Sequence, residues 1–238
     1  MLELSLLFVA AFTAAAVSGI AGFGGALLLL PALVAAIGVT KAVPLLTIVQ
    51  LIGNLSRASF GFKQITWKPV KLFLVAAIPM SVVGAMSFVQ LPKELITRAI
   101  GAIILIFLAL EYFGALKIKA GPVLLITGGA VVGFVSGLVG SAGPLGAAIF
   151  LTLKLAPLAY IASDAITSVV MHGVKIAVYQ HFIDFDQQFW VLAVALGGAM
   201  VLGTWAGKRV VERMSRKRFR WLVAILLVLN AAYMLIHG

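Results

Sequence analysis

Polar side chains at helical spacing interrupt two otherwise apolar stretches of the chain, and they are the residues best suited to chemistry. Over 42–62 they are Gln50, Asn54 and Arg57, and over 157–181 they are Asp164, Ser168, His172 and Lys175. At about 100° per residue, each set forms one stripe along one face of a helix. Ionisable groups in such apolar helices are costly and usually functional. Two cations with neighbouring amide and hydroxyl groups predict a binding site for an anion.

Most of these side chains also have a purely structural interpretation. Arg57 and Lys175 could extend along the apolar surface and place their charges at a membrane interface. Asn54 and Ser168 could hold neighbouring helices together through hydrogen bonds, and His172 could be a hydrogen-bonded histidine of the core. Both interpretations stay open at the level of the sequence.

Asp164 is the one carboxylate in the two stripes. A lone carboxylate inside a membrane could carry a coupling proton, because intramembrane acids often serve as proton relays. It could equally accept hydrogen bonds from Ser163 or Ser168 near the mouth of its helix.

The composition is that of a membrane protein. Hydrophobic residues make up 63% of the 238 positions and charged residues 11%, against about 45–50% and about 25% in soluble domains. The chain has no cysteine, three histidines and no motif of a serine hydrolase, zinc protease or nucleotide-binding loop. We therefore expect no metal site, no cofactor and no enzymatic activity.

The net charge of +11 follows the apolar runs instead of forming a surface for nucleic acid. Seven of the 18 basic residues lie between Lys208 and Arg220, and most others flank apolar runs. Loops rich in lysine and arginine stay in the cytoplasm. The charge therefore indicates membrane topology, and no nucleic-acid partner is expected.

Eight apolar runs are candidates for membrane segments, and two of them are too long for one crossing. The runs cover 4–37, 42–62, 70–90, 94–114, 121–153, 157–181, 187–209 and 217–236. A continuous helix over 4–37 or 121–153 would be about 50 Å long, whereas the hydrocarbon core is about 30 Å thick. Glycine-rich sequences, Ser18–Gly25 and Ser136–Pro144, interrupt both runs in the middle. They predict two re-entrant hairpins, with a long tilted helix packed through small residues as the alternative.

The two glycine-rich sequences belong to an internal repeat with a shift of 118 residues. Pairs related by this shift are Ser18 and Ser136, Gly22 and Gly140, Gly25 and Gly143, Asn54 and His172, and Arg57 and Lys175. Further along the chain the shift drifts, and Gly84 aligns with Gly203. Residues 1–116 and 117–238 are therefore predicted to be two copies of one unit.

Basic residues predict how the two copies are oriented. If both long runs return to their own side, 13 basic residues share the side of Lys208–Arg220, and Lys41, Lys93 and Arg98 lie opposite. This split agrees with the positive-inside rule better than eight simple crossings do. The expected fold is an all-α polytopic membrane protein of two inverted repeats, each with a re-entrant or broken glycine-rich helix followed by three transmembrane helices. Both termini would then face outward.

The glycine-rich tips would add uncharged donors to the site. A half-helix that begins near Gly25 or Gly143 leaves its first N–H groups without partners, and the positive end of its dipole favours an anion. The expected ligands at the tips are Gly22, Gly24, Gly25, Gly140, Ser141 and Gly143. With Asn54, Arg57, Ser168, His172 and Lys175 they would form one anion site between the two copies.

Two glycine-rich sequences that open two halves of a small polytopic protein resemble the TauE/SafE (sulfite exporter) family of membrane permeases. The resemblance covers essentially the whole chain. It implies transport of a small sulfur-containing or organic anion, such as sulfite, sulfoacetate or another sulfonate, across an inner or plasma membrane. The second tip has Ser141-Ala142-Gly143-Pro144 where the first has Phe23-Gly24-Gly25-Ala26, so the two tips need not bind substrate equally.

The expected activity is that of a secondary transporter with alternating access, with a small anion and the lipid bilayer as its partners. An anion channel with the same pocket is the alternative. The oligomeric state stays open, with a homodimer among the options.

Overall fold

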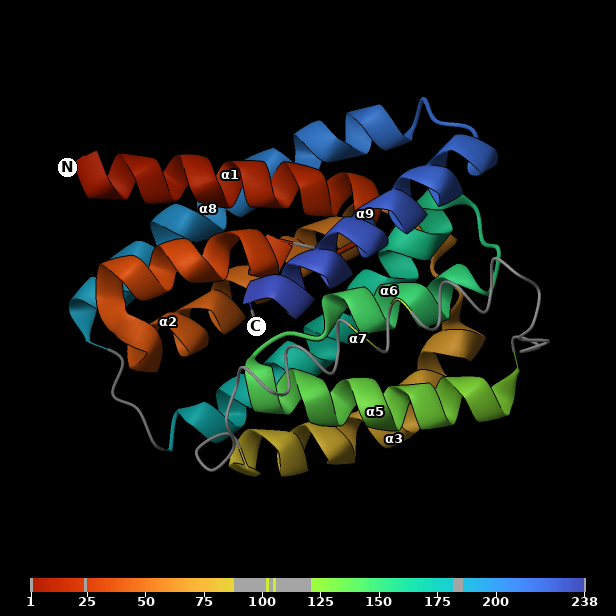
Figure 1. The fold of residues 1–238 in the computed structure, drawn as a ribbon, viewed down its shortest axis with the longest axis horizontal. Coiled ribbons are helices and arrows are strands. Elements are labelled where there is room, and N and C mark those ends of the chain that lie inside the picture. Colours follow the sequence, from red (N-terminus) through yellow and green to blue (C-terminus); the bar gives the residue numbers. More distant parts are fainter. Residues whose placement is uncertain are drawn as a thin grey trace.

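The computed structural model of this protein describes residues 2–23, 25–87, 102, 105, 121–181 and 186–237. This part of the chain is almost entirely helical and contains no strand (Figure 1), which confirms the prediction of an all-α protein. In chain order the elements are α1 (Leu2–Ala21), α2 (Gly25–Phe60), the short 3-10 helix η1 (Phe62–Gln64), α3 (Trp67–Ser87), α5 (Pro122–Val139), α6 (Gly143–Leu151), α7 (Pro157–Tyr179), α8 (Gln187–Val211) and α9 (Arg216–His237).

Four of the described helices are long and apolar enough to cross a membrane. They are Leu4–Ala21 of α1 and the whole of α3, α7 and α8. Large apolar side chains on these helices are exposed, such as Val75 in α3 and Val194 in α8, as expected where a helix meets lipid. The apolar run predicted over 94–114 lies outside the described residues apart from two positions.

Both overlong runs are broken at their glycine-rich sequences. The breaks fall between α1 and α2 and between α5 and α6. Gly22 and Gly140 follow the ends of α1 and α5 with φ angles of 89° and 79°, a conformation that costs other L-residues about 1–2 kcal/mol. A further kink divides α2 at Gly38, where φ is 73°. The two runs are therefore broken helices, and the alternative of single long helices is wrong.

α3 and α5 run parallel and pack through a row of glycines. A Cβ atom added at Gly129 would meet the backbone of Phe73, one at Gly133 that of Ala77, and one at Gly137 that of Ser81. Each step of four residues along α5 matches a step of four along α3, so the two helices stay in register. Glycine at these positions lets the backbones approach closely, as in the small-residue packing of membrane helices.

α1 and α8 pack through glycines in a matching way. A Cβ atom added at Gly84 would meet the backbone of Phe134 and Gly137, and one added at Gly207 that of Ala16 and Gly19. Ala16 and Gly19 lie 118 residues before Phe134 and Gly137. The contacts therefore match Gly84 with Gly207, about one helical turn beyond Gly203, the partner that the sequence alignment predicts. The packing is also reciprocal between the two halves of the chain. α1 of the first half contacts α8 of the second, and α5 of the second half contacts α3 of the first.

The chain from α5 to α7 begins and ends at the same end of the molecule. α5 starts beside the start of α3, since these helices are parallel and in register. α7 also starts near that end, because the backbone N–H of Thr66 donates to Ser163 Oγ at 2.9 Å. Figure 1 shows that the chain reverses direction between α5 and α6. Residues 121–157 therefore form a hairpin within the bundle.

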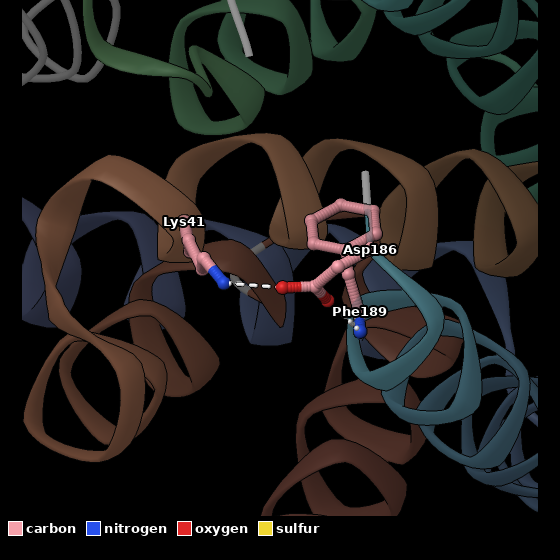
Figure 2. A network of polar contacts seen from close by, with 3 residues as sticks. All are labelled: Lys41, Asp186 and Phe189. Carbon is pink, nitrogen blue, oxygen red and sulfur yellow. Dashed lines mark hydrogen bonds and ion pairs between the residues drawn. The ribbon is translucent and has the colours of Figure 1, made fainter. Parts of the chain in front are cut away.

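An ion pair joins α2 to the start of α8 (Figure 2). The Nζ atom of Lys41 lies 2.6 Å from Oδ2 of Asp186, and both side chains are about half exposed. The other carboxylate oxygen accepts a hydrogen bond of 2.7 Å from the backbone N–H of Phe189 and caps α8. The hydrogen bonds from Lys41 and Phe189 hold the pKa of Asp186 below its ordinary value. An exposed pair of this kind contributes little to folding stability.

Candidate functional site

A cavity lies where the two breaks meet. From the first half it is lined by Ser18, Gly22, Phe23, Gly25, Ala26, Gln50, Asn54, Arg57 and Phe73, and from the second by Val132, Ser136, Ser141, Ala142, Gly143, Gly146, Asp164, Thr167, Ser168, Met171 and His172. Its volume is about 30 Å³, which is room for about two water molecules. Nearly all of these side chains are buried, so the cavity lies inside the bundle.

Most of the residues predicted for the site lie together in this cavity. They are Gly22, Gly25, Asn54, Arg57, Ser141, Gly143, Asp164, Ser168 and His172. Gly140 and Lys175 lie behind the lining, where Lys175 contacts Ser136 and Gly140. Gly24 lies outside the described residues. The roles of these residues as ligands stay predictions.

Some polar lining residues were not predicted as ligands. Ser18, Ser136 and Thr167 line the cavity and are buried. Ser18 and Ser136 are identical residues at matching positions of the repeat, and that match was the available signal. Gln50 was placed on the polar stripe of its helix without a role in the site.

Two helices begin at the cavity. α2 starts at Gly25 and α6 at Gly143, and neither carries an acidic residue in its first turn. A Cβ atom added at Gly143 would lie 3.5 Å from the Cβ of Phe23, so the two breaks are in contact. The first N–H groups of both helices and the positive ends of their dipoles are therefore directed toward the same cavity.

Arg57 and Lys175 bind the carbonyl ends of the two preceding helices in the same pattern. The Arg57 guanidinium donates to the carbonyl oxygens of Ser18 (2.9 Å) and Gly22 (2.6 Å), and the Lys175 ammonium to those of Ser136 (3.4 Å) and Gly140 (2.6 Å). The corresponding partners are 118 residues apart. Each cation therefore offsets the negative end of one helix dipole, α1 for Arg57 and α5 for Lys175.

Burial tests the structural interpretation of these cations. Arg57 is 6% exposed and Lys175 is 0% exposed. Neither charge reaches the surface of the bundle, so the interpretation that they extend to a membrane interface is wrong. Arg57 lines the cavity and also donates to the Asn54 side chain, whereas Lys175 makes its described contacts with the end of α5.

Two buried polar atoms at the cavity are available to a ligand. Gln50 Nε2 and His172 Nδ1 have no hydrogen-bond partner among the described residues, although their side chains are 4% and 6% exposed. Buried polar atoms are nearly always paired in native proteins. These two atoms, on α2 and α7, therefore point to a polar occupant of the cavity.

Broken helices that direct two N-termini into a buried cavity, within a bundle of apolar membrane-length helices, define a multi-pass membrane protein with an internal polar site. The sequence profile of the family Sulfite exporter TauE/SafE matches residues 7–234, and the chain belongs to this family. The resemblance noted from the sequence is thereby confirmed. The description of the family is that of an exporter, which is a class of transporter. No curated protein and no solved structure matches the chain.

Proposed function

We propose that this protein is a secondary transporter, a permease or exporter, of a small sulfur-containing anion, such as sulfite or sulfoacetate, across the inner or plasma membrane. The observation that carries the proposal is the convergence of the N-termini of α2 and α6 on one buried cavity. Helix N-termini bind anions through unpaired N–H groups and the positive end of the dipole. The family to which the chain belongs supports a sulfur-containing anion.

The capping of α1 and α5 strengthens the preference for an anion. A break in a helix places one negative and one positive dipole end side by side, and the two fields partly cancel. Here the negative ends are bound by Arg57 and Lys175. The positive ends of α2 and α6 therefore act on the cavity with little opposition, and the oxygens of a sulfite or sulfonate could accept from several donors at once.

Alternating access between two inverted repeats is the mechanism we propose. The copies are residues 1–116 and 117–238, and the reciprocal packing of α1 on α8 and of α5 on α3 supports this division. The cavity, about 30 Å³, is narrow for an oxyanion, so binding requires the two breaks to separate. A site that opens toward one side at a time suits a transporter, whereas a channel needs a continuous path.

The proposed topology places the re-entrant hairpins on opposite sides and both termini outside. Lys154, between α6 and α7, would then face the cytoplasm, as would Gln64 before α3. Because the chain has no cysteine, a single cysteine at either position reports its side directly. We expect Gln64→Cys and Lys154→Cys to resist a membrane-impermeant thiol reagent applied to intact cells and to react after lysis. Labelling in intact cells would contradict this topology.

Counterflow in proteoliposomes tests the proposed activity. Vesicles loaded with unlabelled sulfite or sulfoacetate should take up the labelled anion transiently, with saturation and at rates far below those of ion channels. Gly25→Val serves as the impaired variant, because a Cβ atom at Gly25 would already lie 3.2 Å from Gln50 Nε2. Single-channel currents from the parent would favour the anion channel, and absence of counterflow with every anion tested would contradict transport.

A further inference from the structure

Asp164 is a buried carboxylate in the lining of the cavity. Its side chain is 3% exposed and lies in the lining, with Oδ1 3.2 Å from the position of a Cβ atom added at Gly146 of α6. No described residue makes a hydrogen bond or ion pair with the carboxylate. The hydroxyl of Ser163, one predicted partner, instead accepts from the backbone of Thr66. Asp164 is therefore placed beside the start of α6, and no described donor binds its carboxylate oxygens.

The charged and titratable groups around Asp164 leave its carboxyl group able to be either protonated or ionised. Arg57 on α2 is the cation whose field acts on it, but Arg57 already donates to two carbonyls and to Asn54. On α7 itself, His172 lines the same cavity, and the Tyr160 hydroxyl donates to Ala147 O at 3.3 Å. α5 and α6 carry no titratable residue, and the lysines of η1 and α3 are exposed.

We propose that Asp164 binds a proton together with the transported anion, so that both cross the membrane in the same direction; this inference rests on the proposed function. An anion and an ionised Asp164 would be like charges in one small cavity. A protonated Asp164 removes that repulsion and gains an O–H donor. Proton and anion therefore strengthen each other's binding, and this linkage is reciprocal.

The proton balance of the cycle is simple. One proton from the side to which the site is open binds the carboxylate oxygen of Asp164, and no bond of the anion breaks. The proton leaves on the other side when the anion leaves. The residue 118 positions earlier is Leu46, which is fully buried and cannot titrate. Among the described residues the cavity therefore carries one such carboxylate, and we expect one proton to move with each anion.

An imposed pH gradient measures this coupling in proteoliposomes. The probe is labelled sulfoacetate, with the membrane potential clamped at zero by potassium and valinomycin. With one pH unit across the membrane, the parent should accumulate the anion about tenfold on the more alkaline side, because one pH unit corresponds to a factor of ten. The ratio is an equilibrium quantity and does not depend on the transport rate.

Accumulation ratios of single-residue variants show which residue carries the proton. Asp164→Asn, with Asp164→Ser as a second variant, should reduce the accumulation ratio to one, whatever counterflow rate remains. The matched control Asp186→Asn changes an exposed carboxylate outside the cavity and should keep the tenfold ratio. His172→Gln should also keep the tenfold accumulation ratio, whatever its effect on the transport rate.

Each other outcome contradicts the inference in its own way. A ratio of one in the parent, with counterflow intact, overturns proton coupling and leaves the transport proposal standing. A tenfold ratio in Asp164→Asn, or its loss in His172→Gln alone, removes Asp164 as the carrier. Absence of counterflow in the parent overturns both proposals. The parent's ratio decides the coupling even if an Asp164 variant does not fold.

Discussion

Replacing Arg57 by glutamine is expected to weaken binding of sulfoacetate or sulfite by about 30-fold or more. Arg57 is the buried cation of the cavity lining. Removing one charge from a buried, charge-paired site typically costs about 2–5 kcal/mol, and each 1.4 kcal/mol corresponds to about a factor of ten. The expected loss also includes the freed carbonyl at Gly22, which would return a negative dipole end to the cavity. Calorimetric titration of the detergent-solubilised protein measures the change.

Two matched variants separate charge from position. Arg57→Lys keeps the charge and should bind more tightly than Arg57→Gln, although a lysine loses the planar fork of the guanidinium. Lys175→Gln removes the matching cation, which lies behind the lining and holds the end of α5. We expect it to lower the melting temperature more than it lowers affinity. If Arg57→Gln and Lys175→Gln both bind the anion as tightly as the parent, the site is built from helix termini and neutral donors.

The polar stripes and the matching positions of Arg57 and Lys175 could be predicted from the sequence because they depend on spacing along the chain. The 118-residue shift pairs Arg57 with Lys175, and these two side chains make corresponding contacts. The positive φ angles of Gly22 and Gly140 fall at the predicted breaks. Helical periodicity defines which face of a helix a residue occupies. This was sufficient to predict most of the residues that line the cavity.

The acceptors of the two cations could not be predicted in the same way. Arg57 reaches carbonyl oxygens 35 and 39 residues earlier in the chain. Every residue has a carbonyl group, so the sequence carries no signal for which one a cation will bind. The stripe predicted that both charges face a substrate, and it gave no sign that both also bind the carbonyl ends of α1 and α5.

The alignment of the two halves of the sequence also did not predict the register in which the helices pack. Gly84 and Gly203 align well as residues, but the contacts match Gly84 with Gly207. Register in such a bundle depends on where two backbones approach each other, which involves both helices at once. The spacing of Gly129, Gly133 and Gly137 was the available signal, because glycines four residues apart mark a close helix contact in membranes.

Replacing Gly137 by alanine is expected to be strongly destabilising for so small a change. The new Cβ atom would lie 2.5 Å from the backbone nitrogen of Ala85 and 2.6 Å from the carbonyl oxygen of Ser81. Backbone atoms cannot move aside as a flexible side chain does, so α3 and α5 would have to separate. Overpacking of this kind costs about 1–3 kcal/mol and sometimes more, and we expect the upper end of that range.

Gly173→Ala is the matched control, because a Cβ atom at Gly173 of α7 meets no atom within 4 Å. Alanine is favoured over glycine inside a helix by roughly 0.5–1 kcal/mol, so this variant should be as stable as the parent or slightly more so. Thermal unfolding of the three proteins in one detergent compares them directly. The close approach of α3 and α5 predicts a clear drop in melting temperature for Gly137→Ala alone. Equal melting temperatures for the two variants would mean that these helices are separated widely enough to admit a methyl group, and the glycine row would then have no role in holding the bundle together.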